Sequence, residues 1–447
     1  MITKNFVILL QNVYNKNMFK KLIQKSLQRY AKKYLKTHSP QLIVVTGSVG
    51  KTSTKIAIAT VLGERYRVRM QDGNHNTEMS VPLAILGIEY PEDIRSVGAW
   101  ISVFQAARLR ISEPKDVDVI VQELGTDRPG DVGHFGKYLK PDVAVVTAVS
   151  PEHMEYFGSI EAVAKEELAV TKFSKYTIIN RDDIDESYAA YATTNSISTY
   201  GLDEKAEYHI ELDVSGPLEG RMGRLITPDW DPISVNLQLI GDHSVKAAVA
   251  AGSVAAKLGL SAEQVAVGMA KITAVPGRMQ LLSGANETCI IDDSYNSSPL
   301  ALSAALKTLQ SIDAPKRVAI IGSMNELGGY SAEAHQKIAE LCDPSKLEFV
   351  VTVGADAGTH FAPAAKERGC QVKVCDSPYE AGGFVRGLLE PGMVVLVKGS
   401  QNRVFTEESI KILLHDINDE QKLVRQSPSW MRKKQSQFQA DIKDTDD

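Results

Sequence analysis

Short runs of apolar residues alternate with longer amphipathic segments along most of the chain. Four runs in the first half are rich in β-branched residues and are bounded by polar residues or glycine: 42–46 (LIVVT), 118–122 (DVIVQ), 143–147 (VAVVT) and 176–180 (YTIIN). Continuous apolar runs of this length are typical of strands that are buried on both faces of a parallel sheet. The pattern therefore predicts an α/β fold built on a parallel sheet.

The same alternation begins again in the second half of the chain. A strand-rich stretch at about 197–240 is followed by two helical segments, 243–258 and 262–272, and Pro276-Gly277 then interrupts the pattern. Beyond this break the predicted strands are 288–292, 317–322, 349–354 and 394–398, with helices between them that include 300–309 and 332–341. We expect a central domain over 39–275, a smaller Rossmann-like α/β domain over 276–426, and a polar tail over 427–447 that is poorly ordered beyond Trp430.

The first 38 residues form a separate basic leader. They contain nine lysines and arginines and no acid, and apolar residues recur every three or four positions from Phe19 to Tyr34. This spacing predicts a basic amphipathic helix. Two interpretations stay open: a helix that docks on its own domain with its basic face solvated, which we favour, and attachment to an anionic membrane surface.

A second amphipathic segment covers about 94–111 and includes Trp100, Phe104 and three arginines. We interpret it as an inserted helix that packs against the leader. Joint contact of the two helices with a membrane, close to a lipid-linked acceptor, is the alternative.

Composition narrows the class of protein. The chain has 447 residues, of which 43% are hydrophobic and 23% charged, as in ordinary globular proteins. A net charge of −5 gives no reason to expect nucleic-acid binding. The four cysteines are too few for a disulfide scaffold and have no metal-ligand spacing. No apolar run approaches the roughly 20 residues of a membrane span, and no signal-peptide core is present, so we expect a cytoplasmic protein, peripheral to the membrane if the leader binds there. We also expect a monomer.

The run 42–46 leads directly into a glycine-rich turn and then a helix. The segment reads GSVGKTS, although Val45 stands where the full phosphate-loop pattern has glycine. Glycines let backbone N–H groups approach phosphates, and the helix N-terminus adds a positive dipole. We expect ATP here, with Lys51 on the terminal phosphates and Thr52 on Mg²⁺. The nucleotide-binding residues predicted in this loop are Gly47, Ser48, Val49, Gly50, Lys51, Thr52 and Ser53.

Two further side chains follow predicted strands. Glu123 closes the 118–122 run, and His153 follows the 143–147 run. In open α/β sheets the ligand crevice lies at the carboxyl ends of the strands, so both should face the same crevice as Lys51. A carboxylate and an imidazole in that position suit a second divalent ion, although histidine is an unusual ligand for Mg²⁺.

Nine motifs occur in a characteristic order. They are TGSVGKTST (46–54), GNHNTEMSVPLAIL (73–86), ELGTDRPGDV (123–132), SPEHMEYFGSIEAVAKEEL (150–168), GDHSVKAAVAA (241–251), PGRM (276–279), IDDSYNSSP (291–299), GSMNELGGYSAEAH (322–335) and VKGSQ (397–401). In these motifs the chain resembles the Mur ligase family, most closely its D-alanyl-D-alanine-adding branch.

The resemblance implies ATP-dependent amide formation through an acyl phosphate, with a UDP-muramoyl tripeptide and D-alanyl-D-alanine as substrates in peptidoglycan synthesis. It implies closure of the C-terminal domain about the 276–277 hinge. The residues implied as catalytic are Lys51, Glu123, His153 and Asn296. Those implied at the nucleotide are His243, Arg278, Asp293 and Tyr295, and those implied at the substrates are Asn74, Asn76, Asn325, Glu326, His335 and Lys398.

The chain departs from the family pattern at several positions. The family has a lysine, usually carbamylated, that bridges to the second metal ion, and counting from His153 puts Glu167 there. We interpret Glu167 as supplying the carboxylate directly, with Lys165 as the competing candidate. The predicted metal ligands are thus Thr52, Glu123, His153 and Glu167.

Other departures weaken the nucleotide and acceptor sites of the pattern. Ser244, Ala247 and Ser298 each stand where the family has asparagine, and Gln401 stands where it has arginine. The basic leader stands where the family has a UDP-binding domain. Two alternatives therefore stay open: another ligase of the superfamily, of the poly-amino-acid or folylpolyglutamate type, and a nucleotide-binding scaffold without catalysis.

Overall fold

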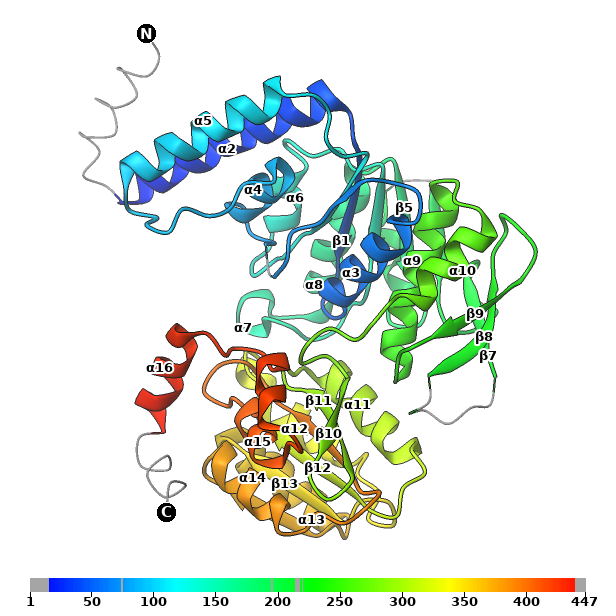
Figure 1. The fold of residues 1–447 in the computed structure, drawn as a ribbon, viewed down its shortest axis with the longest axis vertical. Helices are drawn as coiled ribbons and strands as arrows, with labels where there is room; N and C mark the ends of the chain where they lie inside the picture. Colours follow the sequence, from blue (N-terminus) through cyan, green and yellow to red (C-terminus); the bar gives the residue numbers. More distant parts are fainter. Residues whose placement is uncertain (1–15, 74, 194–195, 214–217, 219, 439–447) are drawn as a thin grey trace.

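Two six-stranded sheets organise the part of the chain that the structure, a computed structural model, describes: residues 16–438 without 74, 194–195, 214–217 and 219. Each sheet belongs to its own α/β domain, and the domains face each other across the middle of the molecule (Figure 1). The α/β class predicted from the apolar runs is confirmed.

The first sheet is parallel throughout and has the order β2-β3-β1-β4-β5-β6. Its strands are β1 (Gln41–Thr46), β2 (Val68–Arg69), β3 (Val119–Glu123), β4 (Val143–Val146), β5 (Tyr176–Asn180) and β6 (Ile197–Tyr200). Successive residues of β1 enter opposite cores, because side chains alternate along a strand: Ile43 packs toward α3 (Lys51–Leu62), α9 (Asp242–Lys257) and α10 (Ala262–Ala270), and Val44 toward α4 (Ser80–Leu86) and α6 (Asp131–Phe135).

Smaller elements complete this domain. They are α7 (Met154–Phe157), α8 (Ile160–Glu167), η1 (Leu168–Lys172), η2 (Glu186–Tyr191) and an antiparallel sheet of β7 (His209–Leu212), β8 (Arg221–Ile226) and β9 (Ile233–Leu237). The strand-rich stretch predicted at about 197–240 is this small sheet together with β6.

The second sheet has the order β10-β11-β15-β12-β13-β14, and only the edge pair β10–β11 is antiparallel. Its strands are β10 (Gln280–Gly284), β11 (Thr288–Asp293), β12 (Arg317–Gly322), β13 (Phe349–Val353), β14 (Val372–Cys375) and β15 (Val394–Lys398). The helical elements around it are α11 (Pro299–Ser311), η3 (Gly328–Tyr330), α12 (Ser331–Ala339), η4 (Ala357–Phe361), α13 (Ala362–Glu367), α14 (Pro378–Arg386), α15 (Glu407–Leu413) and η5 (Ile417–Lys422). The two edge strands β10 and β14 were not among the predicted strands.

The leader and the inserted segment form two helices that lie side by side, α2 (Lys16–His38) and α5 (Val97–Ser112) (Figure 1). Ile23 and Leu27 of α2 are buried with Trp100 and Phe104 of α5. The favoured interpretation, a leader helix that docks on its own domain, is confirmed for residues 16–38.

The basic face of α2 remains in solvent. Its exposed cations are Lys20, Lys21, Lys25, Arg29, Lys32, Lys33 and Lys36. Among the described residues, no helix has both the length and the apolar character that a membrane span requires.

The predicted disorder beyond Trp430 is wrong for the described residues. Helix α16 (Pro428–Gln437) packs on the C-terminal domain, and Lys434 on it is completely buried. Its ammonium lies 2.8 Å from a carboxylate oxygen of Glu407 and 2.6 Å from one of Glu408. These long-range ion pairs hold the helix, and a polar composition gives no sign of them.

Candidate active site

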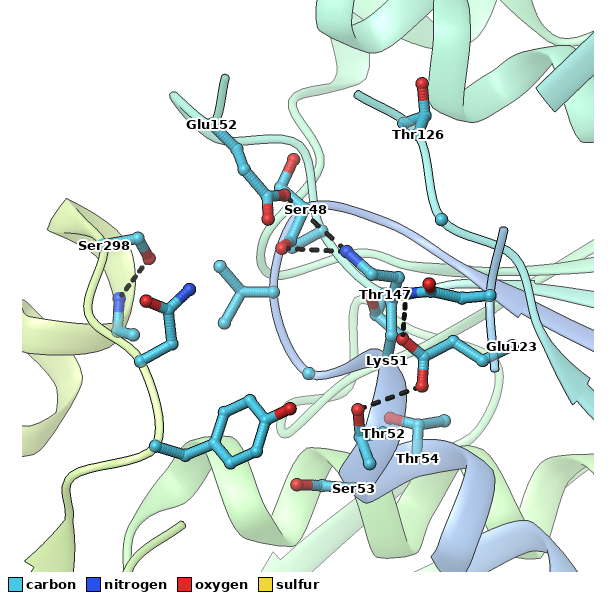
Figure 2. Close-up of a pocket in the computed structure, with 18 of the residues that line it drawn as sticks. Ser48, Lys51, Thr52, Ser53, Thr54, Glu123, Thr126, Thr147, Glu152 and Ser298 are labelled. Carbon is cyan, nitrogen blue, oxygen red and sulfur yellow. Dashed lines mark hydrogen bonds and ion pairs between the residues drawn. The ribbon is translucent and has the colours of Figure 1, made fainter. Parts of the chain in front are cut away.

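A cavity of about 1560 Å³ lies between the two domains. The phosphate loop and the ends of β3 and β4 form one wall, and the loops after β11, β12 and β15 form the other. Figure 2 shows the phosphate-loop side, where Lys51, Thr52 and Glu123 converge. The carboxyl ends of the parallel strands in both sheets therefore open into one space, as expected for ligand crevices in α/β folds.

The phosphate loop depends on two glycines in the left-handed region. Gly47 has φ 123°, and a Cβ on it would collide with the Thr147 side chain. Gly50 has φ 88° and is the N-cap of α3. Because both positions favour glycine, the chain can turn sharply and present the α3 N-terminus, with its unpaired N–H groups, to the cavity. Ser48, Val49 and the residues up to Thr54 line it.

Lys51 is the charged centre of this loop. Its Nζ donates to the Gly47 carbonyl at 2.5 Å and the Ser48 carbonyl at 3.2 Å, and lies 3.7 Å from Glu152 Oε2. Burial acts to lower the pKa of Lys51, but the carboxylates of Glu152, Glu167 and Glu123 outweigh it and the net pKa is raised. The ammonium therefore keeps its charge at the point where phosphates would lie.

Thr52 and Glu123 meet beneath Lys51. The Thr52 hydroxyl donates to Glu123 Oε2 at 2.9 Å, and the Asn76 amide donates to Glu123 Oε1 at 3.0 Å. Hydroxyl and carboxylate oxygens at a phosphate loop are the ligands that Mg²⁺ prefers. This pair fits a magnesium ion, and Asn76 holds the carboxylate in place.

Glu167 lies behind the phosphate loop and not on the cavity wall. It accepts hydrogen bonds from the Thr46 hydroxyl and, at 2.7 Å, from the Gly47 N–H. Burial raises the pKa of Glu167 to about 7, although Lys51 and the two hydrogen bonds oppose the rise. Lys165, the competing candidate, is exposed, with its ammonium 5.1 Å from the centre of the Tyr191 ring.

His153 lines the cavity on the other side of Lys51. It has φ 50°, and its Nδ1 lies 3.2 Å from Glu326 Oε2 of the C-terminal domain, while its Nε2 lies 3.5 Å from Asp127 Oδ1. The predicted metal ligands therefore fall into three groups: Thr52 with Glu123, His153 with acids of both domains, and Glu167 behind the loop. Among the described residues, no three histidine, cysteine or acidic side chains converge as a metal site.

The C-terminal domain contributes a buried ion pair to the opposite wall. Lys398 Nζ lies 2.6 Å from Asp293 Oδ2 and donates to the Asn296 carbonyl at 2.9 Å. Arg278 reaches across the cavity and donates to the Thr52 hydroxyl at 3.3 Å, with its guanidinium 4.1 Å from the centre of the Tyr295 ring. These predicted nucleotide and substrate residues all line the cavity.

The remaining predicted residues differ in position. His243 lines the cavity, and burial lowers its pKa. Asn325 also lines the cavity and is fixed by its amide, which donates to the Asn402 carbonyl at 2.7 Å. His335 does not line the cavity: its ring is buried and accepts a hydrogen bond from the Met324 N–H at 3.0 Å, so any effect on substrate passes through that loop. Asn74 lies outside the described residues.

Two charged residues beside Lys51 and Glu123 were not predicted. Glu152 pairs with Lys51, and Lys55 is buried 4.0 Å from Glu123 Oε2 while donating to the Gln71 and Gly73 carbonyls. Lys55 could have been found, because it lies four residues after Lys51 and therefore on the same face of α3. For Glu152, the only signal in the sequence was its position next to His153.

Comparison with known proteins gives matches over most of the chain. The profile of the Mur ligase middle domain matches residues 45–255, and that of the Mur ligase glutamate ligase domain matches 277–401. UDP-N-acetylmuramoyl-tripeptide–D-alanyl-D-alanine ligase of Bacillus subtilis is 29% identical over 330 residues, which are 74% of this chain and 66% of that protein. The chain thus spans about two thirds of the length of this relative.

Two solved structures share the fold. MurF from Acinetobacter baumannii is 24% identical, with a TM-score of 0.73 over 88% of this chain and 81% of that one. MurF ligase from Thermotoga maritima in complex with ADP is also 24% identical, with a TM-score of 0.71 over 89% and 84%.

Proposed function

Because this chain belongs to the Mur ligase family, we propose that it joins a carboxylate to an amine at the expense of ATP. The observation that supports this most directly is the pairing of two charged walls across one cavity. Lys51, Thr52 and Glu123 form a phosphate-binding wall, and Lys398 with Asp293 faces it from the C-terminal domain.

The proposed reaction has two steps. An acceptor carboxylate oxygen attacks the γ-phosphorus of ATP, the bond to the bridging oxygen breaks, and an acyl phosphate and ADP form. The amine nitrogen then attacks the acyl carbon, phosphate leaves with the bonding electrons, and the nitrogen loses a proton. Positioning and charge neutralisation dominate phosphoryl transfer, so Lys51 and the loop N–H groups would hold the γ-phosphate in line with the acceptor.

A magnesium ion would be held by Thr52 and Glu123. When bound, it would neutralise charge on the phosphates. Glu167 would keep the phosphate loop in its conformation through Thr46 and the Gly47 N–H. Variants of Glu167 would test the prediction that it also supplies the carboxylate of the family's modified lysine.

The C-terminal wall would receive the amine. Lys398 pairs there with Asp293 and donates to the Asn296 carbonyl, and closure about the 276–277 hinge would exclude water from the acyl phosphate. His153 and Glu326, 3.2 Å apart on opposite domains, would close one side of the cavity.

We propose a UDP-muramoyl tripeptide as acceptor and D-alanyl-D-alanine as amine. The support is that Asn325, Glu326 and Leu327 line the cavity, and that the Bacillus subtilis relative is a ligase for these two substrates. Peptidoglycan precursor synthesis would be the setting.

Phosphate release across a panel of acceptors and amines tests the proposal. We expect release that requires both UDP-muramoyl tripeptide and D-alanyl-D-alanine. Release with another pair, such as a folate and glutamate, would keep the ligase reaction and replace the substrates. Absence of release with every pair would identify a nucleotide-binding scaffold and contradict the proposal. Lys51→Met is the matched inactive control, because it removes the charge on the phosphates but keeps a side chain of similar length.

A further inference from the structure

The cavity between the domains continues past the phosphate loop to the paired helices α2 and α5. Phe19, Lys20, Ile23 and Gln24 of α2 line this end, which we call the helical end. The whole cavity of about 1560 Å³ exceeds the 300–1000 Å³ that usually holds one ligand. The nucleotide and the reacting groups therefore leave space that reaches the two helices.

Aromatic rings form one surface of the helical end. Tyr90 and Trp100 both line it, their ring centres are 6.4 Å apart in an edge-on arrangement, and the Trp100 indole N–H donates to the Ile94 carbonyl at 2.9 Å. Trp100 is buried and its only polar atom is occupied, whereas Tyr90 is 36% exposed. The result is a fixed apolar surface that presents the Tyr90 ring to the cavity.

Two cations stand beside these rings. Lys20 and Arg95 line the helical end and are exposed, and neither forms an ion pair within the part of the chain that the structure describes. Two carboxylates that line the same end, Glu78 and Asp131, interact with other groups. Glu78 lies 3.2 Å from His134 Nδ1 and accepts from Gln24, and Asp131 accepts from the Asp127 and Arg128 N–H groups.

Helix α5 adds to this positive character. Its first residue, Val97, lines the cavity, and the Ser96 hydroxyl accepts from the Ala99 N–H as an N-cap. Because the N-terminus of a helix carries partial positive charge, this end favours an anion. Uncompensated cations, a helix N-terminus and an exposed aromatic ring together suit a phosphate group attached to an apolar or planar one.

We propose that the helical end binds the diphosphate-bearing end of the acceptor substrate, with Lys20 and Arg95 on the phosphates and Tyr90 against the group attached to them. This rests on the proposed function, since the acceptor carboxylate must at the same time reach the phosphate loop. The basic leader and the inserted helix thus form a substrate-binding subsite. The diphosphate comes from either a nucleotide or a prenyl lipid, and the experiment separates the two.

The test is charge reversal at the two cations. Lys20→Glu with Arg95→Glu should raise the KM for UDP-linked tripeptide at least tenfold, with kcat and the KM for ATP changed less than twofold. For the muramoyl tripeptide without UDP, the KM should be high and equal in the wild type and the variant. The matched control is Lys32→Glu with Lys33→Glu, which changes the net charge of the whole protein by the same amount at positions that do not line the cavity. An unchanged KM in the double variant would overturn the proposal.

Direct binding keeps this test separate from the proposed function. With the phosphate loop saturated by ADP, UDP and a short prenyl diphosphate are each titrated into wild-type protein and the double variant. Binding by wild type that weakens at least tenfold in the variant supports the subsite even where no acceptor turns over, and the tighter ligand identifies the source. Absence of binding by both, or equal binding by the variant, contradicts it.

Discussion

Three carboxylates act on the ammonium group of Lys51, and each is held in a different way. Glu152 forms an ion pair with it, Glu123 is bonded to Thr52, and Glu167 is buried against the loop backbone. Removing any one of them changes the charge balance of the site, but only Glu167 lacks access to the cavity. Substitutions at this residue can therefore separate a structural role from direct contact with the reacting groups.

Glu167→Ala should lower turnover about thirtyfold or more, because a hydrogen bond to a charged group contributes about 2 kcal/mol and two of them end on this carboxylate. Steady-state phosphate release measures the effect. Lys165→Ala, on the exposed side of the same helix, should stay within twofold of wild type. Glu167→Gln keeps an acceptor for the loop but removes the charge, so full activity in this variant would argue against a metal-bound carboxylate. Unchanged turnover in Glu167→Ala would contradict both roles.

Asp292 gives a prediction about pH. Burial raises its pKa from 3.8 to about 6, against the hydrogen bonds from Ser294, and its Oδ2 is buried without a partner. Between pH 3.8 and about pH 6, Asp292 is therefore protonated in the folded state and ionised in the unfolded state. The stabilising contribution is complete below pH 3.8 and is lost as pH rises through about 6.

Asp292→Asn should remove this dependence. Relative to wild type, the variant should gain up to about 3 kcal/mol between pH 4 and pH 7, since one pKa unit corresponds to about 1.4 kcal/mol. Thermal unfolding of both proteins at matched pH values measures the difference. A difference that stays constant with pH would show that Asp292 is ionised in the folded protein.

At the scale of helices and strands, the sequence predicted the elements that depend on the local pattern of apolar residues. The β-branched runs became β1, β3, β4 and β5, and the inserted helix formed as α5, although it begins at Val97 because Ser96 provides its N-cap. Edge strands β10 and β14 are less buried, and their apolar runs are correspondingly weaker. Helix α16 was missed because the partners of Lys434 lie more than 20 residues earlier in the chain.

Lys434→Met should destabilise the C-terminal domain by about 3–5 kcal/mol. The substitution leaves Glu407 and Glu408 buried with one cation fewer, and breaking a buried ion pair by removing one partner carries a cost of this size. Thermal unfolding measures it. Arg432→Met on the exposed side of α16 is the control and should change stability by less than about 0.5 kcal/mol. Equal stability of the two variants would mean that α16 does not hold the domain.

At the scale of the whole molecule, the sequence predicted which loops meet but not which of their side chains face the cavity. The rule that strand ends share a crevice was enough to bring Lys51, Glu123 and His153 to one cavity. It could not place Glu167 behind the loop or His335 inside its domain, because a motif gives the position of a residue along the chain and not the direction of its side chain. The contribution of α2 to the cavity depends on tertiary packing alone.

The link between the domains gives the last prediction. Gly277 has φ 69°, and a Cβ on it would lie 2.9 Å from Val424 Cγ1 and 3.1 Å from the Tyr295 backbone nitrogen. Gly277→Ala should therefore displace Tyr295 and the neighbouring Arg278, both on the cavity wall, in addition to a cost of roughly 1–2 kcal/mol for the left-handed backbone. If part of that cost opposes closure of the domains, turnover should fall about tenfold, since 1.4 kcal/mol is a factor of ten.

Phosphate release measures turnover, and small-angle X-ray scattering with ATP and acceptor should show less compaction than in wild type. Gly158→Ala, where φ is 70° but a Cβ would meet no atom within 4 Å, is the matched control. Equal turnover and equal compaction in the two variants would show that the domains do not move about this glycine.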